Sequence, residues 1–438
     1  MSSRIQQIPL EIWQEIFMFA CLSEDYSFDT PDPSTEAESE RITCLPYDIT
    51  LVCSRWRKVA SSLPCLWTAI SVDLYGVSQD VRPILRTYLR NARDRPLKIR
   101  LSRLFQSKPH QIQFKDNAMH AYNYLLRNID KCWDLTLTHC GSFSPDVPDD
   151  ALPNMDDGFP SLRVLEIDLN TDESEILEIY LRNALQYTPI LTTLKIGGVF
   201  PEVPVYPFDQ LTQLNISKLK YCTIDILRTW LPLCTNLRVL FLPDVLYEND
   251  SDRPYNNQYN QKPMPSLADL IVNIDEYPDD IYPFFSVFQF PSLSKLCMRI
   301  SGDFAPGDGW PLFFLEALRS SCQSLKKLGL IMDQSNDLTE DAFPVSDILV
   351  VMPNLTSLDF TFQPPIPSTS SRPLTSKNSL SCQILRALTV GHTAPEDMFE
   401  NGSLNEEAWR SHIAQNPSAL LPKLNSLQLQ DENISEDS

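Results

Sequence analysis

A short leucine motif that recurs along most of the chain is the feature that most limits how this sequence can fold. The motif is Leu-x-x-Leu-x-apolar, and clear copies run from Leu162 to Ile167, from Leu191 to Ile196 and from Leu211 to Ile216. Further copies begin at Leu237, Leu267, Leu293, Leu325, Leu355, Leu385 and Leu424, and looser ones at Trp67, Pro96 and Cys132. The typical step is about 29 residues, which predicts a stacked array of small repeated units.

Each copy predicts a short strand, because its last apolar residues alternate with polar ones and so share one face. Such a strand has no stability alone, whereas strands stacked at a fixed step form a parallel ladder and bury a continuous core. A proline stands two places before the first leucine of several copies and predicts the corner that leads into the strand: Pro160, Pro189, Pro265, Pro291, Pro353 and Pro422. Helical spacing appears between strands at 81–92, 176–184, 224–231 and 313–318.

This pattern resembles the leucine-rich-repeat family. The resemblance implies an α/β fold over residues 67–430, an irregular solenoid with parallel strands on the concave side and helices outside. Only Asn170 and Cys140 clearly fill the last, polar position of the family's motif. Three interruptions are expected to be loops: 141–158, 248–263 and 363–379. A mixed α/β domain with leucine-rich strands is the alternative.

The first 66 residues carry a different pattern. The sequence Ile-Pro-Leu-Glu-Ile-Trp-Gln-Glu-Ile-Phe runs from Ile8 to Phe17 and predicts a helix, with Pro9 in its first turn. Ile12, Ile16 and Phe19 fall on one stripe of that helix, with Trp13 and Phe17 on the adjoining stripe. A second helix is expected over residues 51–60, with Val52, Trp56 and Val59 on one face. So many apolar groups on short helices need a partner surface.

The order of these motifs, followed by Leu66-Trp67, is similar to the F-box family, and especially to fungal F-box proteins that continue into degenerate leucine-rich repeats. The resemblance implies a three-helix F-box at residues 1–66 that binds a Skp-type adaptor, which bridges to a cullin. Ile8 and Pro9 correspond to the family's Leu-Pro turn. The implied adaptor-binding residues are Ile8, Pro9, Leu10, Ile12, Trp13, Ile16, Phe17, Leu51, Val52, Cys53 and Trp56.

The segment between the two halves of this block is longer than the family's pattern. Residues 22–46 include an acid-rich stretch with two prolines, which predicts a disordered insertion. The alternative interpretation of the whole block is an amphipathic helical cap on the repeat array. The last residues, 431–438, are expected to be a flexible acidic tail.

The charge balance limits the classes of partner. The formal net charge is −21, so the chain should repel phosphate backbones and anionic lipid, and neither nucleic acid nor a membrane is expected to bind. A protein target with a basic region would fit this charge. We expect it to dock on the concave strand face and on the flanking loops 248–263 and 363–379, and to meet acids such as Asp250, Asp252, Asp275 and Asp279. The alternative is that the charge only aids solubility.

The sequence shows no motif for catalysis or for a bound cofactor. Eleven cysteines include no Cys-x-x-Cys pair, and His139-Cys140 is the only adjacent His/Cys pair, so neither a metal nor a cofactor is expected. Three features favour an intracellular protein, cytoplasmic or nuclear. Cysteines lie beside apolar runs, the first residues lack a secretory pattern, and no apolar stretch reaches about 20 residues.

The function that the sequence favours is that of a non-enzymatic subunit. It would recognise substrates for a Skp–cullin–F-box ubiquitin ligase, with the F-box on the adaptor and the array on the target. A binding scaffold that engages the adaptor without driving ubiquitination is the alternative, and an enzyme within the irregular array is a third.

Overall fold

The computed structural model divides the chain into two compact units, residues 1–211 and 212–438. Its described residues are 8–22, 26, 28, 42, 44–74, 77, 79–102, 116–138, 159–169, 188–198, 207–219, 222–243, 246–247, 261–274, 282–300, 312–333, 352, 354–363, 399–400, 403–404 and 426–431. The division falls within the array and not at residue 66, where the sequence placed a boundary. The N-terminal helices and the first strands therefore belong to one unit.

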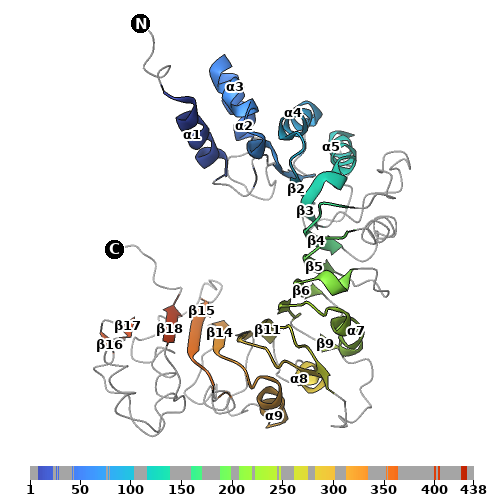
Figure 1. Ribbon diagram of the computed structural model, residues 1–438, viewed down its shortest axis with the longest axis vertical. Helices are drawn as coiled ribbons and strands as arrows, with labels where there is room; N and C mark the ends of the chain where they lie inside the picture. The colour runs from blue at the N-terminus through green and yellow to red at the C-terminus, as the bar shows by residue number, and fades with distance from the viewer. Residues whose placement is uncertain are drawn as a thin grey trace, which may run out of the picture. The chain divides into compact units, whose positions relative to one another are not determined.

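The first unit combines a helical bundle with a parallel sheet (Figure 1). The bundle consists of α1 (Leu10–Leu22), α2 (Leu45–Val52) and α3 (Ser54–Ser61), and the 3-10 turn η2 (Pro64–Trp67) leads out of it. The sheet has the order β1 (Ala69–Asp73), β2 (Leu97–Ser102), β3 (Cys132–Thr138), β4 (Val164–Leu169) and β5 (Thr193–Gly198). The connections carry α4 (Arg82–Ala92), α5 (Asp116–Leu126) and the 3-10 turns η3 (Ile129–Lys131) and η7 (Phe208–Gln210).

The second unit continues the same strand repeat. Its parallel sheet has the order β6 (Gln213–Leu219), β8 (Val239–Phe241), β11 (Asp269–Ile274), β13 (Lys295–Ile300), β14 (Lys327–Asp333), β15 (Ser357–Gln363) and β18 (Ser426–Asp431). The helices described in this unit are α7 (Ile224–Trp230, followed by η8, Leu231–Leu233), α8 (Tyr282–Val287) and α9 (Leu312–Ser321). Short strands pair as β7 (Cys222–Thr223) with β9 (Leu246–Tyr247), β10 (Lys262–Pro263) with β12 (Phe288–Gln289), and β16 (Phe399–Glu400) with β17 (Ser403–Leu404).

The leucine ladder that the motif predicts is confirmed by the strand register. In neighbouring strands the second leucine of one copy pairs with the second leucine of the other, as in Leu240 with Leu270 and Leu296 with Leu328. Leu165, Leu240, Leu296, Leu328 and Leu358 occupy this position, and all five are fully buried. The core of each unit is thus built one rung at a time, because every strand contributes the same apolar face to its neighbours.

The corners before the strands are β-turns. In Phe159–Leu162 the first leucine of the motif donates its backbone N–H to the Phe159 carbonyl at 3.2 Å, with Pro160 at the second position of the turn, which favours proline. Equivalent turns end at Leu191, Leu211, Leu237, Leu267, Leu293, Leu325 and Leu355. The predicted corners at Pro160, Pro189, Pro265 and Pro291 are therefore confirmed, whereas Pro353 and Pro422 lie outside the described residues.

A second ladder, of hydroxyl groups, runs beside these turns. Thr192 donates its hydroxyl to the carbonyl of Arg163 at 3.2 Å, and Thr356 does the same to Lys326 at 3.0 Å. Ser294 reaches Ala268 in the equivalent way. Each hydroxyl follows the first leucine of its motif directly and bonds to the previous rung. This ladder ties rungs together at the start of the strands, a position that the leucine-rich-repeat motif did not indicate.

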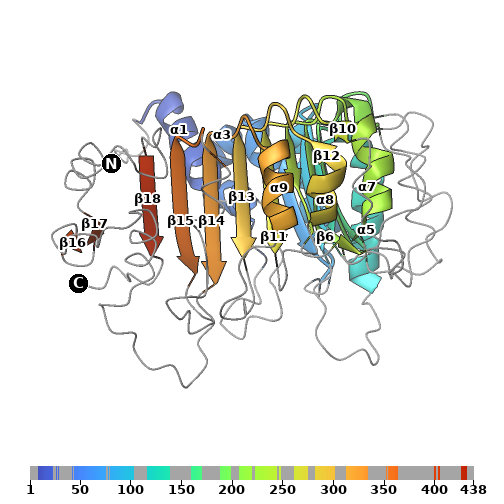
Figure 2. The same cartoon turned by 90° about the horizontal axis from the view of Figure 1, so that it is seen from below.

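Helices cover one face of the second unit's sheet (Figure 2), which agrees with the strand–helix repeat. The expected helices at 81–92, 224–231 and 313–318 are confirmed as α4, α7 and α9, while residues 176–184 lie outside the described part. Among the described helices of the array, the sequence did not predict α5 and α8. In α8 the fully buried rings of Phe284 and Phe285 pack against Phe290 and Phe314.

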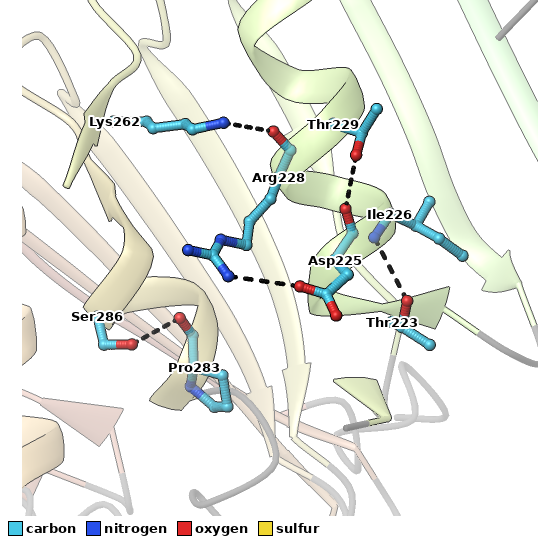
Figure 3. Close-up of polar contacts among 8 residues, drawn as sticks. All are labelled: Thr223, Asp225, Ile226, Arg228, Thr229, Lys262, Pro283 and Ser286. Carbon is cyan, nitrogen blue, oxygen red and sulfur yellow. Dashed lines mark hydrogen bonds and ion pairs between the residues drawn. The ribbon is translucent and has the colours of Figure 1, made fainter. Parts of the chain in front are cut away.

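Polar contacts fix the start of α7 and connect it to the next repeat (Figure 3). The Thr223 side chain accepts a hydrogen bond from the Ile226 backbone N–H at 3.3 Å, which satisfies one of the free donors at the helix start. Lys262 of β10 donates its ammonium group to the Arg228 carbonyl at 2.8 Å. Residues 262–263, which the sequence placed in a loop, therefore form a strand that holds the end of this helix.

One predicted repeat falls on residues that the structure does not describe. The copy that begins at Leu385 lies outside the described residues, and β15 pairs directly with β18, with Leu358 opposite Leu427. No strand therefore lies between β15 and β18. A leucine motif predicts an apolar strand face but does not determine which neighbour the strand will pair with.

The sequence suggested a disordered insertion at residues 22–46, but part of this segment is ordered in the structure. Leu22 ends α1, Leu45 begins α2, and Phe28 forms a parallel bridge with Ile70 of β1. The backbone of Phe28 accepts from the N–H of Ser71 at 2.8 Å, and its ring is fully buried. Phe28 thus covers the outer edge of the first strand, where an open strand edge would otherwise expose unpaired backbone groups.

Candidate functional site

The two apolar stripes of α1 point in different directions. Trp13 and Phe17 are only 6 % and 2 % exposed, because their rings pack on each other and on Trp56 of α3, with ring centroids 5.0–5.7 Å apart. The other stripe, Ile12 and Ile16, is exposed. The sequence assigned Trp13, Phe17 and Trp56 to adaptor contacts. In the structure Trp13 and Phe17 are buried within the bundle, and Trp56 is half-buried against them.

The helix expected over 51–60 is broken at Cys53. This residue has an extended backbone (φ −161°, ψ 167°), so α2 ends at Val52 and α3 begins at Ser54. The Cys53 sulfur accepts the Trp56 backbone N–H at 3.4 Å and caps α3. The expectation that Val52 shares a helical face with Trp56 and Val59 was therefore wrong, and Val52 is exposed.

Exposed large apolar side chains gather on this bundle. Among the described residues, eight such side chains are exposed, and six of them lie on α1 and α2: Leu10, Ile12, Ile16, Phe19, Leu51 and Val52. We call these six the N-terminal apolar surface. Phe19 is 83 % exposed and Leu51 and Val52 are 60 % and 59 % exposed. A concentration of this kind on one small bundle is typical of a protein-binding site.

The turn that precedes α1 is held from the other half of the bundle. Arg55 of α3 donates from Nη2 to the Ile8 carbonyl at 2.6 Å, and the Trp13 backbone N–H donates to the Pro9 carbonyl at 3.3 Å. Pro9 is exposed and Ile8 is half-buried. Arg55 therefore connects residues that are 47 positions apart and positions the Ile8–Pro9 turn beside the N-terminal apolar surface.

The bundle is also fixed to the first repeat. The buried indole of Trp67 donates from Nε1 to the Ala60 carbonyl at the end of α3, at 2.9 Å. The Trp67 and Phe28 rings each pack edge-on against Tyr88 of α4, at 5.0 and 5.5 Å. A surface on α1 and α2 is thus presented from a rigid base, which lowers the entropic cost of binding.

The open face of the first unit's sheet carries charges of both signs. Lys195 of β5 forms an ion pair with Glu166 of β4, its neighbour in register, at 3.0 Å. Burial raises the pKa of the nearby Asp134 carboxyl above its ordinary value, although Lys98 and Lys195 act in the opposite direction. The four acids expected to meet a basic target, Asp250, Asp252, Asp275 and Asp279, lie outside the described residues, as does most of the loops 248–263 and 363–379.

The buried cysteines behave as apolar groups. Burial raises the pKa of the Cys222, Cys234 and Cys322 thiols to about 12, so they stay protonated near neutral pH. Within the ranges that the structure describes, no group of three or more His, Cys, Asp or Glu side chains could hold a metal ion. None of the helices in those ranges is long and apolar enough to cross a membrane.

Comparisons with known proteins add little to this geometry. No family model matches the chain, and no curated protein matches it. Among solved structures, the chain is similar to the leucine-rich repeat-containing protein LegL7 from Legionella pneumophila, with 14 % identity and a TM-score of 0.33. That match covers 75 % of this chain and 92 % of LegL7. The evidence for the parallel ladder is therefore the strand register and the burial of the leucines in this chain.

Proposed function

We propose that this chain is an F-box protein, the substrate-recognition subunit of a Skp–cullin–F-box ubiquitin ligase. In this proposal the three-helix bundle binds a Skp-type adaptor, the adaptor connects to a cullin, and the repeat array binds a protein target. The chain itself has no catalytic role, needs no cofactor, and works inside the cell, in the cytoplasm or nucleus. The order of motifs from Ile8 to Trp67, which is similar to fungal F-box proteins, supports this function.

The observation that carries the proposal is the N-terminal apolar surface. Six exposed large apolar side chains on two short helices have no structural reason to face water, since the bundle already has its own aromatic core. Burial of one such side chain in an interface contributes about 1.5–3 kcal/mol. Ile8, Pro9 and the half of α1 that faces solvent are thus the parts of the sequence assignment that the proposal keeps, together with Leu51, Val52 and Cys53.

The proposal is tested by co-purifying the full chain with a Skp-type adaptor and a cullin. Leu51→Asp with Val52→Asp places two charges on the exposed end of α2 and should abolish capture of both partners. The control is Leu233→Asp, the same kind of change at a single exposed apolar residue of the second unit. Full capture by the α2 variant, or equal loss in the control, would contradict the proposal.

The same experiment separates the ligase subunit from the scaffold that the sequence also permits. A ligase subunit brings the cullin together with the adaptor and increases ubiquitination of its bound target. Capture of the adaptor without the cullin would favour the scaffold, in which the array holds a partner that is not turned over.

A further inference from the structure

Helix α4 carries a row of arginines in a chain that is acidic as a whole. Residues 54–102 contain ten basic and three acidic residues, although the net charge of the chain is −21. Arg82, Arg86 and Arg90 are spaced by four residues, so they lie along one side of the helix, about 6 Å apart. Tyr88, on the opposite side, is fully buried. We call these three basic residues the arginine row.

Nearby acids do not balance the charge of the arginine row. Arg86 and Arg90 are exposed, and neither forms an ion pair with another described residue. Arg82 pairs with Asp80 at 2.8 Å. Asp94, the other acid close to this helix in the sequence, stands between two further arginines beyond the helix end. The outer side of α4 therefore keeps a net positive charge.

The most acidic part of the insertion follows a residue that is fixed to this same helix. Phe28 packs edge-on against Tyr88 of α4, with ring centroids 5.5 Å apart, and its backbone pairs with β1. The next twelve residues, 29–40, contain five acids and no base, and Ile42 is the next described residue. The chain thus brings an acidic segment to the helix that carries the arginine row.

Residues 29–41 are long enough to reach the outer side of α4. The fourteen steps from Phe28 to the next described residue, at about 3.4 Å each, allow the chain to extend roughly 20 Å and to return. A helix with its side chains is only about 10–12 Å across. Glu36, Glu38 and Glu40 occupy alternate positions, which would stand about 7 Å apart in an extended chain. This spacing is close to that of the arginine row.

We infer that the arginine row binds the acidic segment 29–40 of the same chain, with alternate glutamates on Arg86 and Arg90. Arginine suits this role because its planar guanidinium group binds a carboxylate through two parallel hydrogen bonds. The attachment at Phe28 gives the segment a high effective concentration at the row, an advantage over any acidic partner in solution. The inference assigns a role to the insertion and does not depend on the proposed function.

Limited proteolysis of the full chain tests this docking. A protease of broad specificity is added at low salt and at about 0.5 M salt, and cuts within residues 29–41 are followed by mass spectrometry. Arg86→Glu with Arg90→Glu should speed these cuts at least fivefold at low salt, because the row then repels the segment, and high salt should remove most of the difference. Lys326→Glu with Lys327→Glu makes the same change of charge on exposed residues of the second unit and should change the rate less than twofold. Equal rates in the wild type and the α4 variant would overturn the inference.

A charge swap separates direct pairing from general repulsion. Glu36→Arg with Glu38→Arg and Glu40→Arg should speed the cuts by itself, because segment and row then have the same sign. Combined with the two α4 changes, it should restore the wild-type rate. The urea midpoint of each variant shows whether it is folded, and the segment variant alone keeps the test decisive if the α4 variant does not fold. A combined variant that is cut as fast as either parent would contradict direct pairing.

Two fluorescent probes test whether the row serves an external partner instead. A peptide of alternating Glu and Ala and a single-stranded oligonucleotide of equal length are titrated with the full chain, and binding is followed by fluorescence anisotropy. Glu36→Gln with Glu38→Gln and Glu40→Gln should raise the affinity for the Glu peptide at least tenfold, because the row is then uncovered. Binding of either probe to the wild type that the α4 variant removes would overturn the inference, because the row would then be open to a partner.

Discussion

Replacing Leu296 with alanine tests whether the leucine ladder is one continuous core. Leu296 is fully buried and lies in register between Leu270 and Leu328, which are fully buried too. The substitution removes three carbon atoms, worth about 2.4 kcal/mol at roughly 0.8 kcal/mol each. The cavity left behind adds to this, and Leu→Ala changes in cores cost about 2–5 kcal/mol. We expect a loss of about 3 kcal/mol.

Urea unfolding followed by circular dichroism measures this loss. With a slope of about 2–3 kcal/mol per molar urea, 3 kcal/mol should lower the midpoint of the second unit's transition by roughly 1–1.5 M. Lys295→Ala is the matched control, since Lys295 is the exposed neighbour on the same strand and its loss should change stability by less than about 0.5 kcal/mol. A change below about 1 kcal/mol for Leu296→Ala would refute a ladder in which each rung supports the next.

Three further predictions concern the first unit. Phe28→Ala should lower its unfolding free energy by about 3–5 kcal/mol, because the ring is fully buried against Tyr88; no change in a urea midpoint would show that the insertion does not cap β1. Arg55→Ala should weaken adaptor binding about fivefold, or about 1 kcal/mol, and Arg55→Lys should recover part of it; equal affinities by calorimetry would rule out positioning of the Ile8–Pro9 turn. Asp134→Asn should stabilise the unit at pH 7, since burial raises the pKa of Asp134 and its ionised form is disfavoured in the folded state. This gain should disappear below about pH 3.5, where the carboxyl is protonated in both states, and a gain that is the same at both pH values would contradict that origin.

The repeat could be predicted from sequence because its signal is local and periodic. Leucines at a spacing of three and two determine which side chains share a strand face, and turn prolines such as Pro160 mark where each strand begins. The pairing of β15 with β18 could not be predicted, because it is a choice between distant strands that share the same pattern.

Only part of the candidate site could be predicted from the sequence. The pattern of α1 gives two adjoining apolar stripes, and only the partner helix decides that Trp13 and Phe17 turn inward while Ile12 and Ile16 stay exposed. The break at Cys53 is one extended residue in a run that otherwise suits a helix. The sequence offered one cue to a buried role for Phe28: it is an aromatic residue, two positions after Tyr26, within an otherwise acidic segment. The acidic composition of the segment concealed that cue.

The affinity of the purified full chain for a Skp-type adaptor is the measurement that tests the central claim most directly. Pro9→Ala with Ile12→Ala changes an exposed proline at the turn and one exposed residue of α1, so folding should be kept. Loss of an interface anchor often costs more than about 2 kcal/mol, some thirtyfold in affinity. We therefore predict that wild type and a Leu233→Ala control bind alike and that the double variant shows no detectable binding. Unchanged adaptor binding by the double variant, at a normal unfolding midpoint, would contradict the F-box assignment.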